Sequence, residues 1–218
     1  MAIPQALRGP IAGPGLRISG VLCLLAGLAF PLLGTVAGLL GLGVAGLNLA
    51  FFRNPKRTPP PGEGCVVAPA DGRVVEVVAM DDPDGFVGPA WRVAIFLSVF
   101  NVHVQAAPLS GKVRAVRRRG TRFLAAFNPE ASRANVQTRL DVEASTGDRI
   151  AVVQISGLIA RRIPAYVVEG DLLVRGRPYG LICYGSRLEL YLPRRARVQV
   201  QPGQRVRAGQ TQIAEVGS

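Results

Sequence analysis

Residues 18–52 form an uninterrupted stretch of 35 residues that contains no charged side chain. One membrane-spanning helix needs about 20 apolar residues, so this stretch is too long for a single straight crossing. Its Pro-Leu-Leu-Gly sequence at 31–34 predicts a break near the middle. We therefore expect an α-helical membrane anchor folded as a hairpin, with arms at 18–30 and 35–52. A re-entrant first arm and one long tilted helix are the alternatives.

Basic side chains stand on both sides of the anchor, in the N-terminal flank 1–17 and at the start of residues 53–218. They are Arg8 and Arg17 before the anchor and Arg53, Lys56 and Arg57 after it. Cytoplasmic loops carry an excess of such residues, so a hairpin with both ends on the cytoplasmic side of the cell membrane satisfies both clusters. The apolar stretch is also far longer than the core of a secretory signal peptide.

The positive net charge of the chain indicates a negatively charged partner. The formal net charge is +12, and residues 53–218 carry +10 of it (24 basic minus 14 acidic). An anionic lipid surface fits this charge next to a membrane anchor. A nucleic acid is a weaker candidate, because few aromatic residues lie among the arginines and no recognition motif is present.

The residue types also exclude several chemistries. Three widely spaced cysteines give neither a disulfide framework nor a metal-binding pair, so we expect no metal site. Only Lys112 in the folded region could form a Schiff base with pyridoxal phosphate, which makes that cofactor improbable.

From residue 58 onward the sequence is typical of a β protein. Short runs rich in Val, Ile and Leu alternate with Gly and Pro, and two Gly-turn segments at 170–176 and 203–209 resemble each other. We predict a mainly β, barrel-sandwich-like domain with short helical turns near 128–134 or 156–163. The predicted strands are 65–68, 73–78, 91–97, 111–116, 150–155, 166–168, 188–191 and 198–200.

Four motifs then stand out in order. They are Ala-Pro-Ala-Asp-Gly at 68–72, Phe-Asn-Val-His-Val at 100–104, Gly-Leu-Ile-Ala-Arg-Arg-Ile at 157–163 and Tyr-Gly-Leu-Ile-Cys-Tyr-Gly-Ser-Arg at 179–187. Each is weak alone, since a single histidine or an Asp-Gly turn is usually structural. Together, from about residue 52 to 214, they resemble the short, membrane-associated form of the phosphatidylserine decarboxylase proenzyme family. Tyr184 replaces the more usual Phe, and residues 128–135 follow the family pattern only loosely.

The resemblance implies a covalent pyruvoyl cofactor made by self-cleavage between Gly185 and Ser186. The Ser186 hydroxyl would attack the Gly185 carbonyl, and the resulting ester would eliminate to dehydroalanine and hydrolyse to pyruvoyl with loss of ammonia. His103 is the implied base and Asp71 the residue that orients it. The ketone provides the electron sink that decarboxylation of an amino acid requires. In the mature protein, His103 could also protonate the product carbanion.

The implied reaction converts phosphatidylserine in the membrane to phosphatidylethanolamine and CO2. Arg161, Arg162 and Arg187 are candidate partners for its phosphate and carboxylate, or simply a solvated basic face. The two chains made by cleavage are expected to remain associated, and a homo-oligomer stays open. The alternatives are the same chemistry on archaetidylserine and a non-enzymatic, membrane-anchored adaptor.

Overall fold

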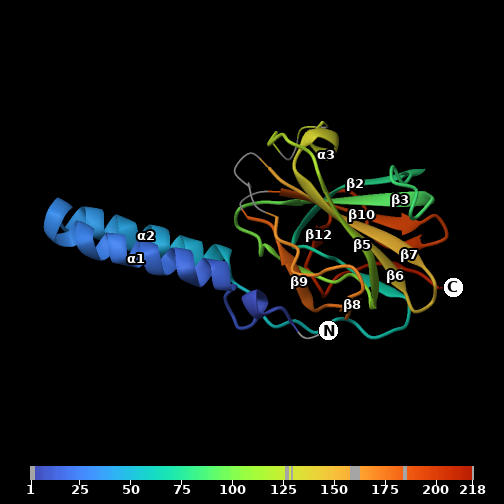
Figure 1. Ribbon diagram of the computed structural model, residues 1–218, viewed down its shortest axis with the longest axis horizontal. Coiled ribbons are helices and arrows are strands. Elements are labelled where there is room, and N and C mark those ends of the chain that lie inside the picture. The colour runs from blue at the N-terminus through green and yellow to red at the C-terminus, as the bar shows by residue number, and fades with distance from the viewer. Residues whose placement is uncertain (1–2, 126–127, 129, 158–162, 184–185, 218) are drawn as a thin grey trace.

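The computed structural model describes residues 3–125, 128, 130–157, 163–183 and 186–217. A pair of long helices projects from one side of a β domain, and the described N-terminal residues lie beside the domain near the base of that pair (Figure 1). The helical elements are η1 (Gln5–Leu7), α1 (Gly13–Leu33), α2 (Thr35–Phe51) and α3 (Ala131–Ala134).

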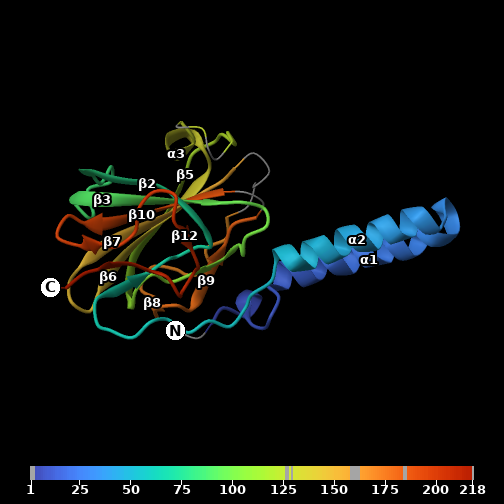
Figure 2. The same ribbon diagram turned by 180° about the vertical axis from the view of Figure 1, so that it is seen from behind.

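The helices α1 and α2 run antiparallel and pack along their length (Figure 2). Gly34 separates them with φ +89°, a left-handed conformation that ends a helix at little cost for glycine. The break expected at 31–34 falls at Gly34, while Pro31 remains inside the last turn of α1. The first arm is therefore longer than 18–30.

Small residues let the two helices approach each other closely. A Cβ at Gly38 would come within 2.5 Å of the Phe30 ring, so a larger residue there would displace that ring. Near the base, the Asn48 amide donates hydrogen bonds to the Gly15 carbonyl (3.2 Å) and the Ser19 hydroxyl (2.7 Å). Length and composition make α1 long and apolar enough to cross a membrane, whereas α2 is shorter.

The β domain contains an eight-stranded antiparallel sheet in the order β12-β2-β3-β10-β7-β6-β5-β8, which curls into a half-barrel. A three-stranded sheet, β1-β13-β11, and a two-stranded sheet, β4-β9, complete the domain. The strands are β1 (Cys65–Val67), β2 (Gly72–Asp81), β3 (Pro89–Leu97), β4 (Val104–Ala106), β5 (Gly111–Arg119), β6 (Gln137–Ala144), β7 (Arg149–Ile155), β8 (Leu172–Leu173), β9 (Pro178–Leu181), β10 (Ser186–Pro193), β11 (Arg197–Val198), β12 (Arg205–Val206) and β13 (Gln212–Glu215).

The concave side of the curled sheet holds the main apolar core. Inward-facing residues such as Val93, Ile95, Leu188 and Leu190 are fully buried there, as alternation along antiparallel strands requires. The mainly β fold class predicted from the sequence is confirmed. The strand expected at 166–168 is absent, because that segment makes only an isolated bridge at Ala165.

The opposite face of the same sheet is also buried, and it combines charged side chains with a small apolar cluster that includes Val153, Ile155 and Tyr191. The Arg139 side chain, 1% exposed, donates through both terminal nitrogens to Asp82 at 2.6 Å and through Nε to Asp141 at 2.7 Å. These ion pairs take the place of apolar packing on β6, which is why a strand with this sequence was not predicted.

Candidate active site

Ser186 is the first residue of β10, a central strand of the large sheet. It lies opposite Leu97 of β3, and its neighbour Arg187 lies opposite Ile155 of β7. Ser186 is fully buried, and its hydroxyl has no hydrogen-bond partner among the described residues. A buried hydroxyl in this state costs about 1–3 kcal/mol, so native proteins keep few of them without a functional reason.

His103 lies just before β4 and is also fully buried. Its Nδ1 is 2.9 Å from the Asn101 carbonyl oxygen, which can only accept, so Nδ1 carries the proton and Nε2 is left as the basic nitrogen. Two hydrogen bonds from Ser98, N–H at 2.9 Å and Oγ at 2.8 Å, fix the Asn101 side chain and hence this loop. The Ile182 N–H donates to the His103 carbonyl at 3.2 Å, so Ile182, four residues before Ser186, lies beside the histidine.

The His103 ring is held in a low-dielectric environment. Burial lowers its pKa from the usual 6.5 to about 4, and the Arg53 charge acts in the same direction. The hydrogen bond to Asn101 and the charge of Asp71 oppose this shift. The imidazole is therefore neutral near pH 7, the state that a general base requires.

Asp71 lies in the turn before β2, close enough for its charge to act on His103. Its carboxylate is held by Arg57, which donates through both terminal nitrogens, with Nη2 at 2.8 Å from Oδ2. The Ala208 N–H also donates to Oδ1 at 2.8 Å. The sequence suggested His103 as the partner of Asp71 and missed Arg57.

Four buried polar atoms without partners gather near Ser186, as far as the described residues show. They are the Ser186 and Ser156 hydroxyls, Gln105 Nε2 and Gln154 Oε1. The register Arg187 opposite Ile155 places Ser156 and Ser186 at matching positions of neighbouring strands, and Gln154 donates to Gln105 Oε1. This concentration of unsatisfied groups marks the strand ends as a site built for an additional polar partner.

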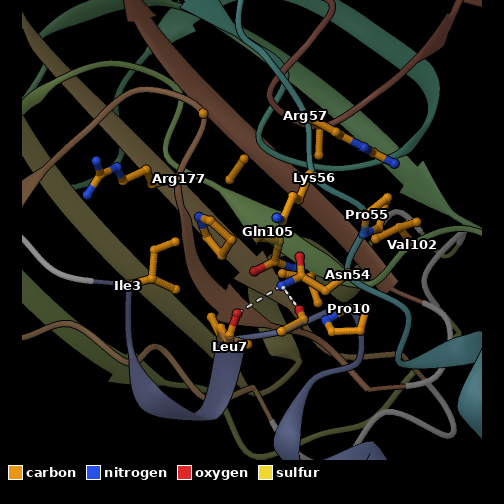
Figure 3. Close-up of a pocket in the computed structure, with 16 residues that line it drawn as sticks. Ile3, Leu7, Pro10, Asn54, Pro55, Lys56, Arg57, Val102, Gln105 and Arg177 are labelled. Carbon is orange, nitrogen blue, oxygen red and sulfur yellow. Dashed lines mark hydrogen bonds between the residues drawn. The ribbon is translucent and has the colours of Figure 1, made fainter.

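A groove of about 910 Å³ adjoins this cluster (Figure 3). Its walls come from the N-terminal segment, the residues after α2 and the start of β4, and Gln105 lines it while its amide reaches Gln154. Apolar Ile3, Leu7 and Val102 share the lining with basic Lys56 and Arg177. Such a groove suits a molecule with apolar and anionic parts.

The three arginines suggested for substrate binding divide into two groups. Arg161 and Arg162 lie outside the described residues, as does Gly185. Arg187 points away from Ser186 by strand alternation, and it donates to Glu189 at 2.9 Å and to Glu76 at 3.1 Å. With two carboxylates on its guanidinium, Arg187 is suited to a structural role on the face of the sheet opposite the main core.

The described residues contain no cluster of three or more His, Cys, Asp or Glu side chains able to hold a metal ion. They do fit a group derived from Ser186, because that hydroxyl is buried and has no partner there, and because Ile182, four residues earlier, is hydrogen-bonded to the neutral His103. The residues present therefore suit a covalent group made from residue 186 itself.

Comparison with known proteins agrees with the chemistry that the site suggests. Residues 45–214 match the model of the phosphatidylserine decarboxylase family. A phosphatidylserine decarboxylase proenzyme of Saccharopolyspora erythraea is 45% identical over 183 residues, covering 83% of this chain and 78% of the relative. Proenzymes of the same name from Mycobacterium sp. strain KMS (43% identity; 99% and 92% covered) and Syntrophotalea carbinolica (42%; 93% and 94%) match almost end to end. The chain belongs to the phosphatidylserine decarboxylase family.

Proposed function

We propose that this protein is a phosphatidylserine decarboxylase that forms its pyruvoyl group by cutting itself between Gly185 and Ser186. The observation that carries the proposal is the Ser186 hydroxyl, buried and without a partner among the described residues at the start of a central strand. Family membership and the proenzyme names of the relatives support the same chemistry. The products are phosphatidylethanolamine and CO2.

In the maturation step, His103 Nε2 takes the Ser186 hydroxyl proton while Oγ attacks the Gly185 carbonyl carbon. The amide is exchanged for an ester, and loss of the Ser186 α-proton then breaks the Cβ–Oγ bond. Oγ leaves with the Gly185 carboxylate, and water replaces the nitrogen of residue 186, which departs as ammonia. The neutral state of His103 supports its role as base.

In the mature enzyme, the pyruvoyl carbonyl supplies an electron sink for the electrons left when the serine carboxylate departs as CO2. His103 takes a proton from the ammonium group of the substrate serine and returns it to the α-carbon after CO2 has left. Gln105, Gln154 and Ser156 offer buried polar atoms that could orient the headgroup. Burial of these groups also keeps water away from the reacting atoms.

The two chains should stay together after cleavage. All eight residues of β10 (Ser186–Pro193) pair with β3, and five of them also pair with β7. The cut therefore falls outside this ladder of strand pairs and leaves the central strand in place.

The helical hairpin is proposed as the membrane anchor. At 1.5 Å per residue, the 21 residues of α1 extend about 31 Å, close to the thickness of the hydrocarbon core. Both ends of the hairpin return to the β domain, so a domain on the cytoplasmic side agrees with the basic flanks and with access to newly made lipid. The positive domain then faces anionic headgroups.

Intact-mass analysis of the purified protein tests this function. We expect a chain of residues 1–185 and a chain of residues 186–218 with a blocked N-terminus, together with release of CO2 from phosphatidylserine vesicles. The Ser186→Ala variant should remain a single inactive chain, whereas the exposed turn variant Ser145→Ala should cleave normally. An uncut wild-type chain would overturn the proposal.

A further inference from the structure

The segment that joins the hairpin to the β domain, residues 51–57, contacts both residues proposed to drive self-cleavage. We call it the junction. The ring of Phe51, the last residue of α2, stacks on the His103 imidazole with centroids 3.9 Å apart and planes at 27°. Phe51 is itself buried, so it contributes to the desolvation of His103 on one face. The base of the anchor thus covers the proposed catalytic base.

Arg57 at the other end of the junction holds Asp71. The contact is bidentate, with each terminal nitrogen on one carboxylate oxygen, and both side chains are less than 15% exposed. Arg57 Nη1 also donates to the Ala208 carbonyl at 2.9 Å, while the Ala208 N–H binds the same carboxylate. A two-point, charge-assisted contact of this kind fixes the carboxylate in position and plane.

The junction is tied to the base of the hairpin. The Asn54 N–H donates to the Pro10 carbonyl at 2.6 Å. The Asn54 side chain donates to the carbonyls of Leu7 (2.8 Å) and Gly9 (3.1 Å), the two dashed lines in Figure 3. The Ala12 N–H donates to the Phe52 carbonyl at 2.9 Å. Because these bonds connect both ends of the hairpin, any displacement of its base reaches Phe51 and Arg57 together.

We propose that the junction is part of the catalytic centre, with Arg57 as the positioning residue of Asp71 and Phe51 as that of His103, so that self-cleavage depends on a seated anchor. The inference rests on the proposed function, because it takes His103 and Asp71 as the maturation groups. The anchor then does more than hold the enzyme at its lipid substrate. A chain whose hairpin base is not docked on the domain remains an uncut precursor.

The first test uses Arg57 variants of the full-length protein, synthesised in a cell-free system with lipid vesicles and sampled on denaturing gels. Arg57→Ala should slow the appearance of the short chain by about 10-fold or more, the effect expected for losing a charge-assisted contact. Added guanidinium ion should restore part of the rate, and Arg57→Lys should lie between because it makes a one-point contact.

Arg175 provides the matched control. It holds the chain just beyond the junction through the carbonyls of Pro60, Gly62 and Cys65 without touching Asp71. Arg175→Ala should therefore cleave within about twofold of wild type. Equal rates for Arg57→Ala and wild type, or an equal slowing by Arg175→Ala, would overturn the role of Arg57. A wild-type protein that makes no short chain would instead count against the proposed function.

The second test concerns Phe51 and does not depend on how Arg57→Ala folds. Phe51→Ala opens one face of His103 to solvent, so the pKa of the imidazole should move up from about 4 toward 6.5. Arg53 and Asp71, the charged groups that act on the ring, are unchanged. The acid limb of the cleavage rate should move to higher pH by the same amount. Phe30→Leu, a change on the hairpin away from the junction, should leave it in place, and an unshifted limb in Phe51→Ala would overturn the coupling.

Discussion

Self-cleavage should remain fast well below neutral pH, because the imidazole of His103 resists protonation. A base acts only in its neutral form, and burial lowers the pKa of this group to about 4. At pH 5, roughly 90% of His103 is then neutral, whereas about 3% of an ordinary histidine with a pKa near 6.5 is neutral. The two cases differ by about 30-fold in the rate expected at pH 5.

The measurement is a pH-jump series. Freshly synthesised precursor is transferred to buffers between pH 4 and 8, and the short chain is followed with time on denaturing gels. We expect a nearly constant rate down to about pH 5 and a fall by half near pH 4. The variant His103→Gln, which retains a polar side chain without a basic nitrogen, should be slow at every pH.

Two results would refute this reasoning. A midpoint near pH 6.5 would mean that His103 is solvated in the precursor, contrary to its burial against Phe51. A normal rate in His103→Gln would remove the histidine from the reaction. In that case its single occurrence in the sequence would have no catalytic meaning.

Three further predictions concern stability and topology. The pKa of His103 is lower in the folded than in the unfolded protein, so the unfolded state binds more protons between pH 6.5 and 4. As the pH falls through this range, the wild type should lose about 3 kcal/mol of its free energy of unfolding, measured by denaturant unfolding, and His103→Gln should not. Arg139→Leu removes the arginine partner of the buried Asp82 carboxylate and should cost about 3–5 kcal/mol in the same assay, whereas Arg114→Ala, which breaks an exposed pair with Glu143, should have little effect. Cysteines introduced at Gln5 and Glu63 should label from the same side of sealed inverted vesicles, and labelling from opposite sides would contradict a hairpin anchor.

The sequence predicts the anchor and the fold class well because both depend on simple patterns. A stretch of 35 residues without charge can only be buried or in lipid, and short runs of β-branched residues between glycines favour strands. The exact end of the first helix was not predictable, since Pro31 and Gly34 are both helix breakers. The structure distinguishes them through the positive φ of Gly34.

One missed strand has a clear physical cause. The strand β6 (Gln137–Ala144) contains Arg139, Asp141 and Glu143, so its polar sequence conceals a strand whose first six residues are buried. The same limit applies to the site. Ser186, His103 and Asp71 follow from motifs, but Arg57 becomes visible only when the chain after α2 folds back onto the turn before β2. Contacts between separate segments cannot be read from local pattern.

The burial of the Ser186 hydroxyl should favour the proposed conversion of this residue to a pyruvoyl group. Its hydroxyl is removed from water and has no partner in the described part of the chain, so the precursor carries an unfavourable term of about 1–3 kcal/mol at this position. In the proposed reaction Oγ leaves with the Gly185 carboxylate, and that term disappears from residue 186. The surrounding strand pairs need not change, because Ser186 is already the first residue of β10. Maturation therefore removes the free-energy cost of the buried Ser186 hydroxyl while the sheet that holds the site stays intact.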